Sequence, residues 1–284
     1  MALKLEGKAV VQKLRENMKL RILRLQENSI TPTFLLIRVG EREDDISYER
    51  GILKNCELLG IKVIVKDLSK DVNMDEITAV IKEANEDRNI HGIMLFRPLP
   101  PQLNLEILSN IINPEKDIDC MSPVNLERVF EGSSKGFAPC TAKAVIELLK
   151  HYEVNLKGAN VSVIGRSLVV GKPLAMMLLE EGATVTICHS KTKDMSAITS
   201  KADIVVAAIG RAKFITDNYL SSNSIVIDVG INTDENGKIC GDVDFDSVFS
   251  KVKAINSAVG GVGSITNTIL LEHVVKACEK LENI

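Results

Sequence analysis

Apolar and polar positions follow two alternating patterns through the first half of the chain. Apolar side chains recur at helical spacing in residues 9–27 and 44–59, and a further helix is expected over residues 73–84. Short apolar runs, typical of buried strands, occupy residues 33–39, 62–68 and 92–96. The second helical segment stops at Gly60, and Asn73 is a favourable N-cap for the third. Strands that alternate with helices predict a parallel α/β sheet.

A second α/β series begins at Ala159. Apolar runs predict strands at residues 161–164, 183–188, 203–209 and 224–229. Helices are expected at residues 172–181 and 264–281, and a hairpin turn at residues 234–237. Residues 111–123 and 132–141 are polar and turn-rich, and the first of them is expected to form a loop over a cleft. The pattern therefore predicts two α/β domains with an interdomain cleft, a usual place for small-molecule sites.

Composition narrows the class of protein. A length of 284 residues suggests about two domains. The formal charge of −3 leaves no global basic field, which argues against a dedicated binder of nucleic acid or of an anionic membrane. No run approaches the roughly 20 apolar residues of a membrane span, and the N-terminus lacks the apolar core of a signal peptide, so we expect a cytoplasmic protein. The six cysteines form no C-x-x-C pair, which favours reduced thiols and predicts no metal site.

The most informative stretch is NVSVIGRSLVVGKP, residues 160–173. An apolar strand runs into Gly165, then Arg166 and Ser167 follow, and Gly171 precedes a proline in the first turn of a helix. The unpaired N–H groups of such a turn attract phosphate, which is how a dinucleotide loop works. The motif is not G-x-G-x-x-G, and an ordinary strand-to-helix turn remains an alternative at this point.

The next strand favours NADP over NAD. An NAD site places an acidic residue about 20 residues past the loop to take the ribose hydroxyl. Here the strand ends in His189, Ser190 and Lys191, and no acid occurs before Asp194. A hydroxyl and a cation, together with Arg166, suit a 2′-phosphate. We interpret His189 as a supporting side chain and not as a catalytic one.

Several motifs resemble a single family. They are VIGRSLVVGKP, ATVTICHSKT, VIDVGIN (226–232), VGGVGSIT (259–266), KDID (116–119) and PCT (139–141). In this order, and over nearly the whole chain, they resemble the bifunctional methylenetetrahydrofolate dehydrogenase/cyclohydrolase family. The resemblance implies a folate-binding and catalytic domain over residues 1–121, onto which residues 267–284 pack back. It also implies a Rossmann-like NADP-binding domain over residues 122–266, a tetrahydrofolate derivative as substrate, and a homodimer.

The resemblance also assigns roles to individual residues. For the cofactor it implies Gly165, Arg166, Ser167, Ser190 and Ile231, with the arginine and Ser190 facing the 2′-phosphate. For the folate it implies Tyr48, Leu95, Phe96, Asp119, Gly260, Gly261 and Gly263, of which Tyr48 and Asp119 are the candidate catalytic residues.

The match breaks in the folate half. The family has a lysine four residues after its tyrosine and a glutamine in a strand ending G-x-x-x-Q-L-P, and here these positions hold Ile52 and Phe96. Lys54 is about 1.67 helical turns from Tyr48, so it points away from the tyrosine's face. The remaining departures are Cys120 for a glycine, Val259 and Ser264 for prolines, and Ala142 in the PCTP motif.

We therefore predict an NADP-dependent dehydrogenase of one-carbon folate metabolism whose cyclohydrolase activity is weak or lost. Hydride transfer needs positioning and no general base, whereas hydrolysis needs proton transfer, for which the family uses its lysine. Three alternatives stay open. The first is a fully bifunctional enzyme that uses a relocated side chain such as Arg97. The second is a non-catalytic relative that binds NADP or folate, and the third is a different NADP dehydrogenase on the same scaffold.

Overall fold

The computed structural model describes residues 2–284 and divides into two compact units. The first unit holds the residues up to Lys13 together with Pro139–Thr266. The second holds Leu14–Ala138 together with Asn267–Ile284. Neither unit is continuous in sequence, because helices α1 (Gly7–Glu27) and α10 (Val262–Glu282) each begin in the first unit and continue in the second.

The first unit is built on a six-stranded parallel sheet in the order β1-β11-β8-β7-β5-β6. Its strands are β1 (Leu3–Leu5), β5 (Asn160–Ile164), β6 (Thr184–Cys188), β7 (Ile204–Ala207), β8 (Ile225–Asp228) and β11 (Ala254–Asn256). Strand β5 has β6 on one side and β7 on the other, so the winding of the chain reverses there. In such sheets ligands bind outside the carboxyl ends of the strands at this reversal.

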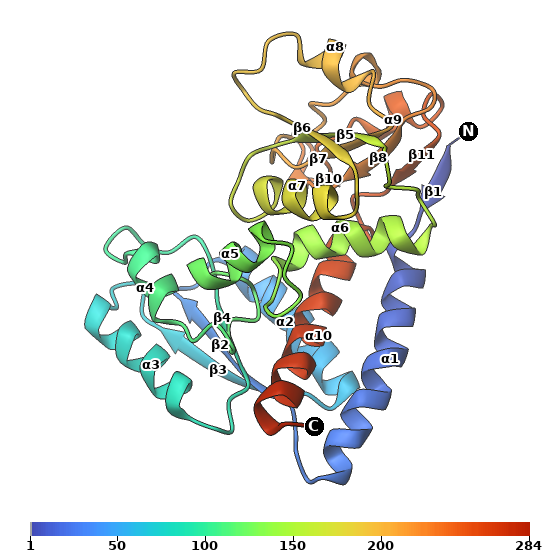
Figure 1. The fold of residues 1–284 in the computed structure, drawn as a ribbon. Coiled ribbons are helices and arrows are strands. Elements are labelled where there is room, and N and C mark those ends of the chain that lie inside the picture. The colour runs from blue at the N-terminus through green and yellow to red at the C-terminus, as the bar shows by residue number, and fades with distance from the viewer. Residues whose placement is uncertain (1) are drawn as a thin grey trace. The chain divides into compact units, whose positions relative to one another are not determined.

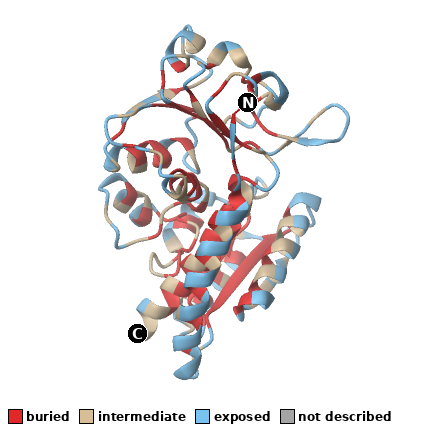
Figure 2. Ribbon diagram, turned by 90° about the vertical axis from the view of Figure 1, so that its right-hand side faces the viewer, coloured by how far each residue is buried: buried red, intermediate tan, exposed pale blue. Residues whose placement is uncertain are grey.

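Helices cover both faces of the six-stranded sheet. Figure 1 shows α6 (Cys140–His151) and α7 (Gly171–Glu180) below it, and α8 (Met195–Thr199) and α9 (Phe245–Val248) above it. The chain also forms a 3₁₀ turn, Asp217–Tyr219, and an antiparallel hairpin of β9 (Asn232–Thr233) and β10 (Ile239–Cys240). The central strands β7 and β8 are almost entirely buried, as Figure 2 shows, which explains their continuous apolar sequence.

The second unit is built on a three-stranded parallel sheet in the order β3-β2-β4. Its strands are β2 (Thr33–Val39), β3 (Lys62–Leu68) and β4 (Gly92–Leu95), and its helices α2 (Glu43–Leu59), α3 (Met74–Glu86), α4 (Leu105–Ile111) and α5 (Pro123–Phe130). One face packs on α3 and α4 through an aliphatic core that includes Ile37, Leu95, Ile81 and Leu108. Figure 1 shows α3 and α4 on that side of the sheet.

Residues 267–284 belong to the second unit through specific contacts. Arg21 on α1 forms an ion pair with Glu279 on α10, with 2.7 Å between Nη2 and Oε2. His273 lies 2.9 Å from the carbonyl oxygen of Ile118, and its ring packs against Phe137. The division into a 1–121 domain and a 122–266 domain stays a prediction.

Most predicted elements have bounds within two residues of the observed ones. The runs at residues 33–39 and 62–68 are β2 and β3, and α2 ends at Gly60, whose φ of +74° is the left-handed conformation that glycine favours. Asn73 caps α3, and its side chain accepts from the backbone N–H groups of Asp75 and Glu76. Among residues 2–284 no helix has the length and apolar character needed to cross a membrane.

Candidate functional site

The loop between β5 and α7 is closed too tightly for any residue but glycine at two positions. Gly165 has a φ of +130°, and a Cβ there would lie 2.1 Å from the carbonyl oxygen of Ala208. A Cβ at Gly171 would lie 2.1 Å from the carbonyl oxygen of Gly165. The first turn of α7 therefore lies directly against the end of β5, at the reversal of the sheet. Dinucleotide phosphates bind at this place in such sheets, so the loop is in a suitable position for one.

The polar side chains of this loop divide into internal supports and exposed groups. The hydroxyl of Ser167 accepts from the N–H of Val170 at 3.1 Å, so this predicted cofactor residue also shapes the loop. Arg166 is exposed, and so is Ser190 at the end of β6. His189 is a support, since its Nδ1 accepts from the N–H of Lys191 at 3.1 Å. These contacts agree with the interpretation of His189 as a non-catalytic residue.

A buried carboxylate holds the two loops that follow β7 and β8. Asp242, fully buried, accepts from the three consecutive N–H groups of residues 209–211 at 2.7, 3.1 and 2.8 Å. It also accepts from the side-chain amide of Asn232 at 2.9 Å. Asn232 follows Ile231, a predicted cofactor residue whose side chain is exposed. Asp242 thus fixes the backbone on which Ile231 is presented.

A second buried carboxylate supports the first. Asp228, at the end of β8, accepts from the N–H groups of Gly230, Asp242 and Val243, each at 3.0 Å. Burial raises the pKa of Asp228 to about 6, and the nearby charge of Asp242 adds to the shift. Sequence reasoning did not identify either acid, because their donors become neighbours only when the loops of the unit assemble.

The glycine loop that leads into α10 lies beside Ile231. A Cβ at Gly263 would lie 3.1 Å from Cδ1 of Ile231, so these two predicted residues are neighbours. Gly261 is buried and has no room for a Cβ, which would lie 2.1 Å from the carbonyl oxygen of Ser257. Gly260 is exposed with a φ of +73°. The loop therefore combines a fixed backbone with an exposed edge.

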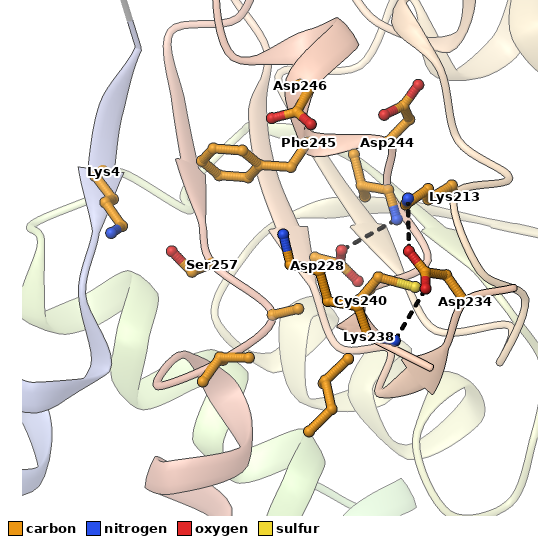
Figure 3. A pocket seen from close by; sticks show the side chains of 15 residues that line it. Lys4, Lys213, Asp228, Asp234, Lys238, Cys240, Asp244, Phe245, Asp246 and Ser257 are labelled. Carbon is orange, nitrogen blue, oxygen red and sulfur yellow. Dashed lines mark hydrogen bonds and ion pairs between the residues drawn. The ribbon is translucent and has the colours of Figure 1, made fainter. Parts of the chain in front are cut away.

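A cavity of about 260 Å³ lies beside this loop in the first unit, as Figure 3 shows. Its walls include Lys4, Asp228, Phe245 and Ser257, and Lys213 pairs there with Asp234, with 3.0 Å between Nζ and Oδ2. None of the predicted cofactor or folate residues lines it. The cavity therefore adjoins the predicted folate loop without containing any of the predicted residues.

In the second unit, helix α2 and the end of β4 bring Tyr48 and Phe96 together. Their ring centroids lie 6.0 Å apart, with ring planes at 78°, in an edge-to-face contact. Ile52, one turn after Tyr48 on α2, has no exposed surface. Lys54 is exposed, as the helical register predicts. The positions where the family has lysine and glutamine are therefore buried and apolar in this chain.

Asp119 is held by an arginine. Nη2 of Arg97 lies 2.7 Å from Oδ2 of Asp119, and both side chains are partly buried. The preceding residues of the KDID motif are supports, because Lys116 donates to the carbonyl groups of Ala84 and Asp87. Asp119 is the member of the motif that lies beside the end of β4.

Cys120 and Leu95, which also lie in this region, are both buried. Cys120, at the position of the family's glycine, has a φ of +54° and is buried, and burial raises the pKa of its thiol. The side chain of Leu95 packs in the aliphatic core under α3 and does not join the side chains of Tyr48 and Phe96. Whether the predicted residues bind folate or NADP stays a prediction.

Comparison with known proteins agrees with this geometry. Residues 5–119 match the model of the tetrahydrofolate dehydrogenase/cyclohydrolase catalytic domain, and residues 139–282 match the NAD(P)-binding domain of the same family. The chain belongs to the tetrahydrofolate dehydrogenase/cyclohydrolase family. Membership confirms the predicted family and two-domain α/β class, and it confirms NADP as the cofactor class and a methylenetetrahydrofolate dehydrogenase as the class of enzyme.

The similarity to individual relatives extends over whole chains. The bifunctional protein FolD 1 of Desulfitobacterium hafniense is 56% identical over 275 residues, which cover 97% of this chain and 98% of the relative. The bifunctional FolD of Clostridioides difficile is 51% identical over 279 residues, covering 98% and 97%.

Solved structures of the family agree with the fold. The bifunctional FolD of Campylobacter jejuni superposes with a TM-score of 0.96 at 38% identity and covers 99% of both chains. The Trypanosoma brucei enzyme, solved with NADP cofactor and an inhibitor, superposes with a TM-score of 0.94 at 30% identity, covering 100% and 99%.

Proposed function

We propose that this chain is an NADP-dependent methylenetetrahydrofolate dehydrogenase of one-carbon folate metabolism whose cyclohydrolase activity is weak or lost. One observation carries the second half of the proposal. Ile52 is fully buried one turn from Tyr48, and Phe96 lies against the ring of Tyr48. These apolar side chains occupy the positions where family motifs have a lysine and a glutamine.

The dehydrogenase step does not need the missing lysine. The C–H bond of the methylene carbon between two folate nitrogens breaks, and the lone pairs of those nitrogens stabilise the cation that remains. NADP supplies the hydride acceptor. The chain must position the folate, and the carboxylate of Asp119 is a suitable hydrogen-bond acceptor for the pterin ring.

Hydrolysis of the methenyl cation has a different requirement. A water molecule must lose a proton as it attacks, and the resulting adduct must gain one as it collapses. General acid–base catalysis of this kind contributes about 10²–10⁴-fold. Ile52 and Phe96 can neither donate nor accept a proton. Because both positions are apolar, no buried lysine is left without its glutamine neighbour. A buried cation without a partner would be costly in free energy.

The cofactor assignment is supported by the loops of the first unit. The close approach of Gly165, Gly171 and Ala208 holds the loop compactly at the reversal of the sheet, where a phosphate would bind. Arg166 and Ser190 are exposed at the ends of the neighbouring strands β5 and β6, where they would hold the 2′-phosphate. A planar guanidinium matches a phosphate with two parallel hydrogen bonds.

A fully bifunctional enzyme is the second candidate, favoured by the names of the relatives at 51–56% identity. Arg97 would have to replace the lysine in that case. A guanidinium is not deprotonated in proteins, so it cannot act as the base for water. Its ion pair with Asp119 also counts against a role in proton transfer.

We further propose that the chain acts as a cytoplasmic homodimer, as its family resemblance implies. Light scattering of the purified protein tests the assembly. A homodimer gives twice the 31.1 kDa of the chain, and a mass that stays at one chain over micromolar concentrations contradicts it.

Two assays test the enzymatic proposal. Methylenetetrahydrofolate with NADP should produce reduced nicotinamide, and a protein that binds both without turnover would instead be a non-catalytic relative. Methenyltetrahydrofolate alone should disappear at a rate close to that in buffer. The bifunctional Campylobacter jejuni relative is the positive control for both assays.

A further inference from the structure

Arg97 is a charged residue at a position where the family motif has leucine. The motif G-x-x-x-Q-L-P aligns with Gly92 to Pro98, which places Arg97 directly after Phe96. Its guanidinium lies 2.7 Å from the carboxylate of Asp119, and the two side chains are 24% and 19% exposed. At this distance and burial the pair is a charge-assisted hydrogen bond with limited screening by solvent.

The neighbouring acid is already satisfied by other donors. Asp117 is fully buried and accepts from the N–H groups of Met121 and Ser122, each at 2.8 Å, and from the side chain of Asn125 at 2.9 Å. The guanidinium of Arg97 is therefore matched to Asp119. With Ile52 at the family's lysine position on α2, Arg97 brings a positive charge to Asp119 from the end of β4.

This arrangement has a consequence for the two states of the folate. An uncompensated carboxylate attracts the methenyl cation more strongly than the methylene form, whose one-carbon unit is uncharged. A carboxylate paired with arginine has lost most of that preference while keeping oxygen lone pairs for neutral hydrogen bonds. The Arg97–Asp119 pair thus offers a fixed hydrogen-bond acceptor for the folate and carries a low net charge.

We propose that Arg97 is a positioning and specificity-determining residue, which fixes and neutralises Asp119 so that the second unit binds the methylene substrate and releases the methenyl cation. This inference rests on the proposed dehydrogenase function. It also means that Ile52 in place of the family's lysine and Arg97 in place of its leucine act on the same property, the charge around Asp119. Replacing Ile52 by lysine would then add a second cation to a group of side chains whose carboxylate is already paired.

The first experiment replaces Arg97 and measures steady-state kinetics of the dehydrogenase. For Arg97→Leu we expect methenyltetrahydrofolate to inhibit at about tenfold lower concentration, since the guanidinium then no longer offsets the charge of Asp119. The KM for methylenetetrahydrofolate should change less than threefold, and kcat should fall because product leaves more slowly. Arg97→Lys, which keeps the charge, should stay within threefold of wild type in all three quantities.

The matched control is Arg21→Leu. Arg21 and Glu279 form an ion pair of the same 2.7 Å length, with exposures of 26% and 25%, on α1 and α10 of the same unit. Its loss should leave the ratio of methenyl inhibition to methylene KM unchanged. If Arg97→Leu fails to fold, Arg97→Gln gives the same test with a polar side chain.

The outcomes separate this inference from the proposed function. Equal changes in affinity for both folates, or weaker inhibition by the methenyl form, would overturn the role of Arg97 while the wild-type enzyme remains a dehydrogenase. Absence of NADP reduction by the wild type would instead overturn the proposed function itself.

A second measurement tests the link with the lost lysine. The double variant Ile52→Lys with Phe96→Gln should hydrolyse methenyltetrahydrofolate at least tenfold more slowly than the same variant that also carries Arg97→Leu. Equal hydrolysis by the two variants would show that Arg97 does not oppose the lysine.

Discussion

At the scale of single residues, the folate half of the chain differs from its family in side chains whose environments are consistent with one another. Ile52 is fully buried, and Phe96 contacts the ring of Tyr48, so both substitutions are packed as apolar residues. Arg97 pairs with Asp119 within the same group. The sequence alone identified the first two changes but left the role of Arg97 open, because its partner lies 22 residues away.

The buried acid Asp228 makes a prediction about pH. Its pKa of about 6 lies above its ordinary value of 3.8, so the folded chain binds this proton more tightly than the unfolded chain does. Its contribution to stability is therefore greatest below about pH 4 and is lost as the pH rises through about 6. The rise of the pKa from 3.8 to about 6 corresponds to about 3 kcal/mol in the free energy of unfolding.

Urea unfolding of wild type and Asp228→Asn at several pH values measures this effect. The difference in unfolding free energy between the two proteins should move in favour of the variant by up to about 3 kcal/mol from pH 4 to pH 7. A difference that is constant with pH would show that Asp228 titrates normally. The other carboxyl groups are common to both proteins, so their pH-dependent contributions to the free energy of unfolding cancel in the difference. This includes groups whose contribution is lost as the pH falls.

At the scale of elements, the β5–α7 loop depends on backbone geometry more than on side chains. The sequence predicts a phosphate loop at its glycines, but their packing against Ala208 follows from the neighbouring strand β7. The same limit explains the strands that the pattern did not reveal. β1 and β11 have three residues each, and β11 pairs with β8 on one side and, across the length of the chain, with β1 on the other.

Gly165→Ala should abolish NADP binding. The new Cβ would lie 2.1 Å from the carbonyl oxygen of Ala208, and the φ of +130° is unfavourable for alanine, so the loop must move. Gly158→Ala is the control, because Gly158 also has a positive φ, +73°, but no atom lies within 4 Å of its Cβ. Calorimetric titration with NADP should find binding only in the control, and equal affinities would contradict the loop's role.

Arg166→Leu should change the choice of cofactor. Loss of a charged hydrogen bond to the 2′-phosphate should raise the KM for NADP by about 10–100-fold. The KM for NAD, which lacks that phosphate, should stay within threefold of wild type. A parallel rise for both cofactors would place Arg166 on the shared part of the dinucleotide or on the loop structure.

At the scale of the whole molecule, the pattern of alternating strands and helices was sufficient for the fold class, and long motifs were sufficient for the family. Local sequence patterns do not reveal that each unit is assembled from segments that lie far apart in the chain. The N-terminal strand β1 completes a sheet made of residues beyond Pro139, whereas residues after Thr266 join the unit of residues 14–138. Such assignments depend on contacts between distant parts of the chain, which local periodicity does not encode.

The ratio of the two activities in one preparation tests the central claim most directly. Initial rates of NADP reduction and of methenyltetrahydrofolate hydrolysis above the buffer rate should be measured for this chain and for the Campylobacter jejuni enzyme. We expect comparable dehydrogenase rates and a hydrolysis rate at least about 100-fold lower in this chain, as loss of acid–base catalysis predicts. Hydrolysis within tenfold of the bifunctional enzyme, at equal dehydrogenase activity, would contradict the account.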